Sequence, residues 1–181
     1  MRIIAGERRG HKLIEFSGED IRPTTDRVKE SLFNLIQEYV SDADVLDMFS
    51  GSGALSFEAL SRGANSATCL DIDKRSIDVI RKNCASLNYE QKCEIINTSC
   101  FDFLKRCTKQ YDLILLDPPY NKDFIEKTLS EIVQHGIIAD DGIIVLESDS
   151  TDFHSDFGNL QLLKQRKYGR TYITVYQNSN N

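Results

Sequence analysis

The residues whose types and spacing most clearly suggest chemistry are Asp117-Pro118-Pro119-Tyr120, which follow a mostly apolar run at residues 111–116. This run lacks the alternation of a half-exposed strand, so it indicates a strand that is buried on both faces. Consecutive prolines lack backbone N–H donors and hold φ near −65°, so the strand must end there. In open parallel sheets, ligands bind beyond the carboxyl ends of the strands. We therefore expect Asp117 and Tyr120 to face a bound ligand.

A turn of this kind offers hydrogen-bond acceptors and an aromatic face. The Asp117 carboxylate and the backbone carbonyls without a partner in the sheet can accept hydrogen bonds from an amino group, and the Tyr120 ring can stack on the planar ring that carries it. An Asp or Asn followed by two prolines and a Tyr or Phe is typical of enzymes that methylate exocyclic amino groups. The structural alternative is a turn that ends the strand and packs Tyr120 in the core.

A second candidate site is the glycine turn that follows an expected strand at 44–48. Gly51 and Gly53 permit close approach of a ligand to the backbone, and free amides at the start of a helix attract an anionic group. A dinucleotide-binding turn would have a third glycine where this chain has Ser56, and Asp47 would oppose a pyrophosphate. An acid at Asp47 suits the ammonium of an amino-acid-like ligand instead. S-adenosylmethionine carries such an ammonium and no phosphate.

Two further acids follow the next expected strand, at 67–71. Asp71 lies about 20 residues after the glycine turn, where an acid commonly accepts hydrogen bonds from ribose hydroxyls. For Asp73 we favour a structural role as the N-cap of the following helix. The glycine turn, Asp71 and Asp117 together predict a methyl-donor site beside a base-binding turn.

An alternation of strands and helices begins near residue 44 and predicts a mostly parallel sheet with crossover helices. Before it, residues 3–4 and 12–16 flank a glycine-bounded tip with Arg8 and Arg9, which reads as a β-hairpin. A helix is expected from the Thr-Thr-Asp at 24–26 to about Tyr39. We place the strands at 44–48, 67–71, 93–97, 111–116, 138–146, 160–164 and 172–176, and the later helices near 53–62, 74–87, 101–107 and 123–135.

Length and composition favour one α/β domain with a small appendage. We expect a mostly parallel seven-stranded sheet with helices on both faces and an antiparallel C-terminal hairpin, with residues 1–20 as a basic β-hairpin appendage and residues 21–181 as the main domain. Hydrophobic residues make up 40% and charged residues 28% of the 181 residues, and no apolar run reaches the roughly 18 residues of a membrane span. The beginning of the chain does not read as a signal peptide, so we expect a cytoplasmic protein without a membrane partner.

The distribution of charge is more informative than the net charge of −6, which does not favour a general nucleic-acid binder. Basic residues gather at 1–12 and again at 164–170, although solvated turns would explain each cluster equally well. The five cysteines show no Cys-x-x-Cys spacing. We therefore expect neither a zinc site nor a disulfide framework, and no metal.

Several blocks resemble the RsmD family of class I S-adenosylmethionine-dependent methyltransferases, over nearly the whole chain. The resemblance implies a Rossmann-like class I methyltransferase fold and a bacterial enzyme that methylates the 2-amino group of guanine 966 in 16S rRNA, on the assembled or assembling small ribosomal subunit. The blocks are Arg2-Ile3-Ile4-Ala5-Gly6 with Arg9-Gly10, Arg22-Pro23-Thr24 with Asp26-Arg27, residues 46–55, residues 58–64, Asp117-Pro118-Pro119-Tyr120, and Tyr168-Gly169.

The resemblance also implies roles for individual residues. The acceptor guanine would be held by Asp117, Pro118, Pro119 and Tyr120. The methyl donor would be held by Asp47, Phe49, Ser50, Gly51, Gly53, Asp71, Ile72, Ser99, Cys100 and Phe101, and the RNA by Arg8, Arg9, His11, Arg22 and Arg27.

Two departures from the family pattern concern the donor site. Ser56 replaces a usual glycine, and Ser99-Cys100 falls where an acid that contacts the adenine amino group is often found. Backbone and apolar contacts through Cys100 and Phe101 would then hold the adenine.

Two other functions stay open at this point. A DNA adenine-N6 methyltransferase also uses Asp-Pro-Pro-Tyr, but 181 residues leave no room for a sequence-reading module. A non-catalytic S-adenosylmethionine-binding factor in ribosome assembly would use the same pocket, although intact Asp117 and Tyr120 argue against it. We expect a monomer, because no long heptad pattern is present.

Overall fold

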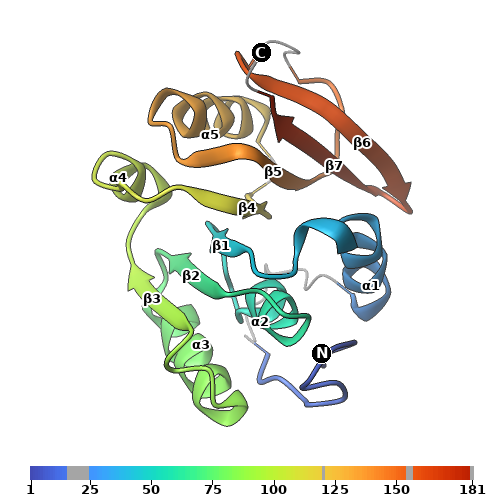
Figure 1. The fold of residues 1–181 in the computed structure, drawn as a ribbon, viewed down its shortest axis with the longest axis vertical. Helices are drawn as coiled ribbons and strands as arrows, with labels where there is room; N and C mark the ends of the chain where they lie inside the picture. The colour runs from blue at the N-terminus through green and yellow to red at the C-terminus, as the bar shows by residue number, and fades with distance from the viewer. Residues whose placement is uncertain (16–24, 120, 154–156, 180–181) are drawn as a thin grey trace.

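The computed structural model describes residues 1–15, 25–119, 121–153 and 157–179, and its centre is one seven-stranded sheet (Figure 1). The strand order is β3-β2-β1-β4-β5-β7-β6. Strands β1 to β5 are mutually parallel, whereas β7 is antiparallel to both of its neighbours. The strands are β1 (Asp44–Asp47), β2 (Ser66–Asp71), β3 (Cys93–Asn97), β4 (Tyr111–Leu116), β5 (Ile138–Ser148), β6 (Leu160–Tyr168) and β7 (Thr171–Asn178).

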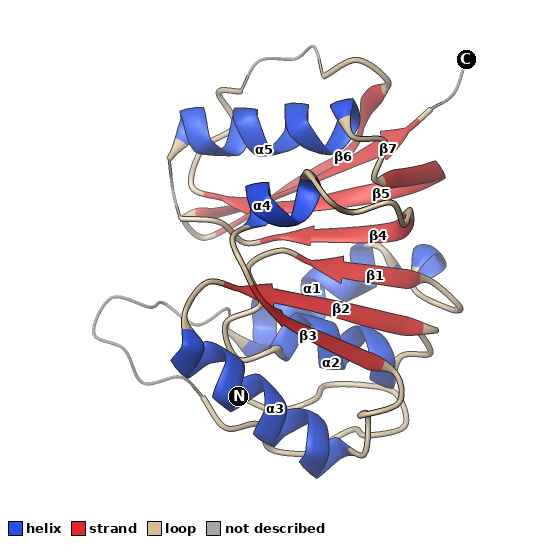
Figure 2. Ribbon diagram, turned by 90° about the vertical axis from the view of Figure 1, so that its left-hand side faces the viewer, coloured by secondary structure: helices blue, strands red, loops and turns tan. Residues whose placement is uncertain are grey.

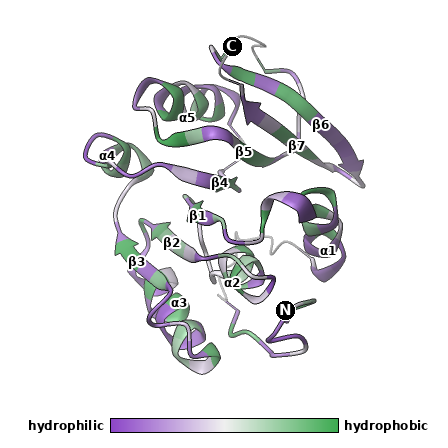
Figure 3. Ribbon diagram, viewed as in Figure 1, coloured by the Kyte–Doolittle hydropathy of each residue, from purple (hydrophilic) through white to green (hydrophobic). Residues whose placement is uncertain are grey.

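Helices cover both faces of the sheet (Figure 2). Alternate residues of β4 and β5 enter two separate apolar clusters, one with α1, α2 and α3 and the other with α4 and α5. Figure 3 shows the apolar residues concentrated along the central strands and the buried sides of the helices. The helices are α1 (Asp26–Leu35), the 3₁₀ turn η1 (Gln37–Tyr39), α2 (Ala54–Ser61), α3 (Lys74–Leu87), α4 (Cys100–Leu104) and α5 (Lys122–Gln134).

This architecture confirms the expected fold class, and the differences lie at element ends. The helix expected to reach Tyr39 ends at Leu35, because Ile36 leaves the helical region with φ −115° and ψ 16°. Helix α4 is shorter than the expected 101–107, since Ser99 caps its start and Lys105 already forms its C-cap. Strands β5, β6 and β7 each extend beyond the predicted ranges.

The direction of β6 matters for the site. Because β7 is antiparallel to β5 and β6 is antiparallel to β7, β6 runs in the same direction as β5 and β4. The turn Gly169-Arg170 between β6 and β7 therefore lies at the carboxyl edge of the sheet, where β1 and β4 also end. Helices α2 and α3 begin at this edge and end at the amino edge.

The expected N-terminal hairpin is present in a reduced form, as a single antiparallel bridge between Arg2 and Lys12. Its strands are short because their N–H groups bond elsewhere: Ile4 N and Ala5 N donate to the Glu58 carboxylate of α2 at 2.8 and 3.1 Å. The backbone of Gly6, with φ +83°, lies so close to the Ser61 carbonyl that a Cβ would overlap it. The described part of this segment is thus packed against α2, and the proposed boundary at residue 20 lies outside the described residues.

Buried charges anchor the same segment. Lys29 and Glu58 are both fully buried, 3.4 Å apart, and Arg62 Nε donates to Glu58 Oε1 at 2.7 Å. Lys29 Nζ also donates to the Arg2 carbonyl. Burial lowers the pKa of Lys29, against the attraction of Glu58. A buried pair of this kind is destabilising to break, so it fixes where the N-terminal segment lies.

No helix among the described residues has the length and apolar character needed to span a membrane.

Candidate active site

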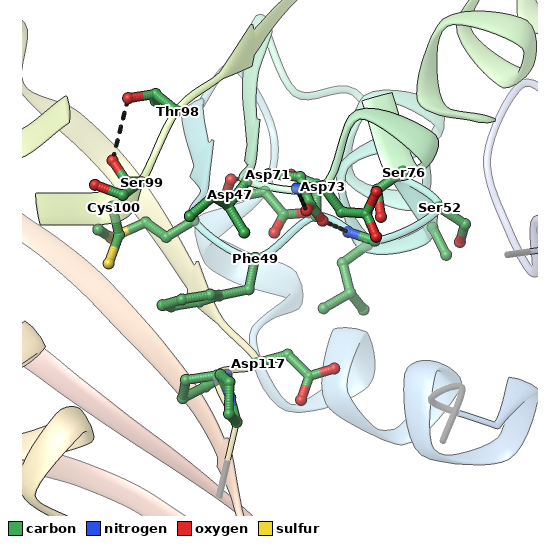
Figure 4. Close-up of a pocket in the computed structure, with 18 of the residues that line it drawn as sticks. Asp47, Phe49, Ser52, Asp71, Asp73, Ser76, Thr98, Ser99, Cys100 and Asp117 are labelled. Carbon is green, nitrogen blue, oxygen red and sulfur yellow. Dashed lines mark hydrogen bonds between the residues drawn. The ribbon is translucent and has the colours of Figure 1, made fainter. Parts of the chain in front are cut away.

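A cavity of about 730 Å³ opens at the carboxyl edge of the sheet, where β1, β2 and β4 end and α2, α3 and α4 begin (Figure 4). Its size is within the range of about 300–1,000 Å³ that is usual for small-molecule sites. All of the donor-site residues expected from the sequence line it except Gly53, and so do Asp117, Pro118 and Pro119. Its other lining residues are Met1, Glu15, Met48, Ser52, Ala54, Leu55, Asp73, Ser76, Thr98 and Phe124.

The glycine turn at residues 50–53 lines one side of this cavity. Both glycines have positive φ, +54° at Gly51 and +78° at Gly53. A Cβ on Gly53 would lie 2.4 Å from the Phe57 ring, whereas a Cβ on Gly51 would meet nothing within 4 Å. Gly53, the N-cap of α2, therefore packs closely against Phe57, whereas Gly51 faces the cavity.

Asp47 is the most deeply buried acid of the site, with 1% of its surface exposed. Burial raises its pKa to about 6, although the Ser56 hydroxyl, which donates to Asp47 Oδ2 at 2.7 Å, acts to lower it. The carboxylate is thus ionised at neutral pH but has little water around it, an environment that favours a cationic ligand. Ser56, which the sequence showed only as a departure from a glycine pattern, is the partner that holds this carboxylate.

Asp71 connects the second strand to the glycine turn. Its carboxylate accepts hydrogen bonds from Gly51 N at 2.9 Å and from Asp73 N at 2.8 Å. Burial raises the pKa of Asp71, and these two bonds oppose the rise. Asp73 caps α3 by accepting from Arg75 N, which confirms its expected structural role. Ile72, 74% exposed, presents an apolar surface beside the cavity.

The opposite wall is aromatic. Phe124 of α5 lies edge-on to Phe49 and to Phe101, with ring centroids 5.7 and 5.3 Å away, and Lys127 Nζ lies 4.5 Å from the Phe101 ring centroid. Ser99 caps α4, accepting from Asp102 N and donating to Asp102 Oδ2 at 2.8 Å. Sequence reasoning missed Phe124, because it flanks the inward stripe of α5 and its contacts come from two other segments.

Asp117 lies at the carboxyl end of β4 and lines the cavity together with Pro118 and Pro119. In the view of Figure 4, Asp47 and Asp71 lie above Phe49 and Asp117 lies below it. Tyr120 lies outside the described residues, so its stacking role stays a prediction.

Glu147 is a further acid at this edge that the sequence reading did not single out. Leu116, the last residue of β4, pairs with Leu146 of β5, so Glu147 follows on β5 at the level where the chain leaves β4 for Asp117. Glu147 is only 6% exposed. No local motif marks it, and only the register between β4 and β5 brings it to this edge.

The basic hairpin tip lies elsewhere. Arg8 N donates to Ser61 Oγ at the end of α2, the Arg8 guanidinium lies 5.7 Å from the Tyr89 ring centroid, and His11 Nε2 is 3.2 Å from Ser86 Oγ at the end of α3. These contacts place Arg8, Arg9 and His11 toward the amino edge, separated from the cavity by the length of α2, about 12 Å. Arg27 is exposed near the start of α1, and Arg22 lies outside the described residues.

The described residues contain no group of three or more His, Cys, Asp or Glu side chains that could hold a metal ion.

Comparison with known proteins agrees with this arrangement. Residues 1–177 match the family model described as Conserved hypothetical protein 95. The chain is 38% identical to Ribosomal RNA small subunit methyltransferase D of Haemophilus influenzae, over 98% of this chain and 94% of the relative. It is 34% identical to the protein of the same name from Escherichia coli K12, over 98% of this chain and 89% of the relative.

A solved structure extends the likeness to three dimensions. The structure described as the putative methyltransferase yhhF from Escherichia coli superimposes with a TM-score of 0.89 at 34% identity, covering 99% of this chain and 98% of that one. Sequence and structure both match over nearly the full length, so the chain belongs to the Conserved hypothetical protein 95 family, the RsmD family of methyltransferases.

Proposed function

We propose that this protein is an S-adenosylmethionine-dependent methyltransferase of small-subunit ribosomal RNA, and that it methylates the exocyclic N2 amino group of a guanine, position 966 of 16S rRNA. The names of the two relatives support the reaction and the class of substrate. One observation carries the proposal: the carboxylates of Asp47 and Asp71 line the same cavity as the Asp117-Pro118 turn. A donor and an acceptor can therefore meet in one space.

The donor half of the site, which comprises Asp47, the glycine turn at 50–53, Asp71, Ile72 and Phe101, fits S-adenosylmethionine. Asp47 offers a buried carboxylate to the ammonium, and the amides of the glycine turn suit the carboxylate. Asp71 can accept from ribose hydroxyls, and Ile72 with Phe101 offers apolar surface to the adenine. When bound, this donor supplies a methyl group on a positively charged sulfur, which is a good leaving group.

The acceptor half orients the amino group. Asp117 and the Pro118 carbonyl accept its two N–H hydrogen bonds, which draws the nitrogen lone pair out of conjugation with the ring and aims it at the methyl carbon. As the methyl group passes from the donor sulfur to this nitrogen, the nitrogen would give up one proton, and the Asp117 carboxylate that is hydrogen-bonded to it can accept that proton. The target base must leave its stack to reach Asp117. Adenine N6 carries the same two N–H donors, so the choice of guanine rests on the family resemblance.

The test is to incubate the protein with methyl-labelled S-adenosylmethionine and small ribosomal subunits that lack the modification, with protein-free 16S rRNA and plasmid DNA in parallel. Digestion to nucleosides then identifies the product. We expect label as N2-methylguanosine in the subunits. Label as N6-methyladenine in DNA would overturn the proposal in favour of a DNA enzyme, and measurable donor binding without label in any substrate would indicate a non-catalytic factor.

A further inference from the structure

A second hollow lies at the same edge of the sheet as Asp117, between the start of α1 and the turn that joins β6 to β7. It has a volume of about 370 Å³ and is lined by Arg27, Val28, Lys167, Tyr168 and Gly169. Its position follows from the topology, because β6 runs parallel to β4 and ends at the carboxyl edge. Figure 1 shows the end of β6 pointing toward α1.

The rim of this hollow is basic in a protein of net charge −6. Arg27, Lys167 and Arg170 are exposed, and no ion pair with an acid of the described residues neutralises any of them. Asp26, the acid next to Arg27, pairs instead with Arg2 at 3.5 Å, and Glu38 pairs with Lys164 at 3.0 Å. Figure 3 shows β6 becoming hydrophilic toward this end.

Two features position Lys167 and the backbone of Arg170. Lys167 Nζ lies 4.9 Å from the centroid of the Tyr172 ring, its cross-strand partner in β7. The turn Gly169-Arg170 has only two residues, with Gly169 at φ +63°, so the backbone of Arg170 is fixed at the tip of a tight hairpin. Exposed cations that have no acidic partner among the described residues are suited to bind phosphate groups.

We propose that Arg27, Lys167 and Arg170 form a binding site for backbone phosphates of the RNA that flanks the target nucleotide. The proposal rests on the proposed function and names the surface on which the RNA strand lies. RNA is favoured over an acidic protein segment because the hollow shares the carboxyl edge with Asp117, where the target base must enter. The glycine-bounded tip with Arg8 and Arg9 faces the amino edge and contacts α2 and Tyr89 instead.

The experiment compares Arg27→Gln, Lys167→Gln, Arg170→Gln and the triple variant with the wild type in steady-state methylation of small subunits at several salt concentrations. Each single change should raise KM for the subunit about three- to tenfold and reduce the slope of log KM against log salt by about 0.7, as expected for one lost phosphate contact. The kcat at saturating subunit, the Kd for S-adenosylmethionine and the Tm should stay within error. Lys82→Gln, an exposed change on α3, serves as the charge-matched control.

Three outcomes would overturn the proposal: an unchanged KM in the triple variant, a raised KM with an unchanged salt slope, or a raised KM in Arg9→Gln but not in Lys167→Gln. An effect with subunits that disappears with protein-free rRNA would assign the surface to a ribosomal protein. If the wild type labels no RNA, the proposed function fails by itself. The phosphate site can then still be tested by the Kd of the wild type and the triple variant for a protein-free 16S rRNA fragment. The proposal requires weaker binding by the triple variant.

Discussion

The donor half and the acceptor half of the carboxyl edge are built in different ways. In the donor half, the groups that hold each carboxylate lie within 20 residues of it: Ser56 holds Asp47, and Gly51 and Asp73 hold Asp71. In the acceptor half, Asp117, Glu147 and the basic rim at Arg27 and Lys167 come from four segments spread over most of the chain.

The difference has an electrostatic counterpart. The donor half is preorganised around buried acids, one with a pKa raised to about 6, and suits a small cation. The acceptor half carries exposed basic residues at its rim that form no ion pair with an acid of the described residues, which suits an anionic polymer. We therefore expect changes in the donor half to act on donor affinity, and changes in the acceptor half to act on turnover or on KM for RNA.

Asp117→Asn provides the strongest test of this division. Asparagine keeps the shape and one acceptor but removes the negative charge that the developing positive nitrogen needs. We expect kcat on small subunits to fall about 10²–10³-fold, the usual cost of removing one catalytic electrostatic partner. The Kd for S-adenosylmethionine, measured by calorimetry, should change less than about twofold because Asp47 and Asp71 are untouched. Turnover near that of the wild type would remove Asp117 from the catalytic role.

Gly53→Ala tests how rigid the donor half is. The added Cβ would lie 2.4 Å from the Phe57 ring at a backbone φ of +78°, so the variant combines a clash with backbone strain. We expect a loss of about 2–4 kcal/mol of unfolding free energy by denaturant titration, and weaker donor binding. Gly51→Ala is the matched control, since its φ is also positive but a Cβ there meets nothing within 4 Å. Equal stability losses in the two variants would show that the Phe57 contact is not the cause.

Asp47→Asn separates affinity from stability. Loss of the charged partner of an ammonium should weaken donor binding about 10- to 100-fold. The donor-free protein should not lose stability at pH 7.5, because the folded-state pKa is raised from the ordinary 3.8 to about 6. Because the folded-state pKa is the higher one, protonation of Asp47 stabilises the folded state. This stabilisation is complete below about pH 4 and is lost as the pH rises through 6. A large drop in Tm at neutral pH would contradict this account of the buried carboxylate.

Much of the donor half could be predicted from the sequence, because its signals are local. The glycine turn follows a buried strand, Asp71 ends the next strand, and Asp73 caps the helix after it, so each is defined by a few neighbouring residues. The strands themselves followed from apolar runs and were predicted to within two residues for β1 to β4.

The parts that sequence reasoning missed depend on register and packing between distant segments. Glu147 lies at the carboxyl edge near the end of β4 only because Leu116 pairs with Leu146. Phe124 belongs to the cavity only because α5 packs across Phe49 and Phe101. The two basic segments look alike in sequence. Hydrogen bonds donated by backbone N–H groups of the N-terminal segment to Glu58 and Ser61 hold the first segment toward the amino edge. The direction of β6 brings the second segment to the carboxyl edge.

Ser56→Ala has the smallest expected effect. It tests whether the Ser56 hydroxyl sets the pKa of Asp47. The Ser56 hydroxyl donates to Asp47 Oδ2 and lowers its pKa against the effect of burial, so its removal should raise that pKa above the present value of about 6. One net hydrogen bond of about 0.5–1.5 kcal/mol corresponds to a rise of about 0.4–1.1 pH units. Donor affinity depends on the ionised carboxylate, so it is present above this pKa and falls as pH drops through it.

The measurement is the Kd for S-adenosylmethionine between pH 5 and pH 8.5. In Ser56→Ala the fall in affinity should begin at higher pH than in the wild type, while the Kd at pH 8 changes less than about threefold. Ser50→Ala is the matched control, because its hydroxyl donates to the backbone carbonyl of the same aspartate at 3.0 Å and its loss should move the midpoint less. If both variants keep the wild-type midpoint, Ser56 fills space beside Asp47 and does not change its pKa. The raised pKa of Asp47 would then be set by its burial and not by the Ser56 hydroxyl.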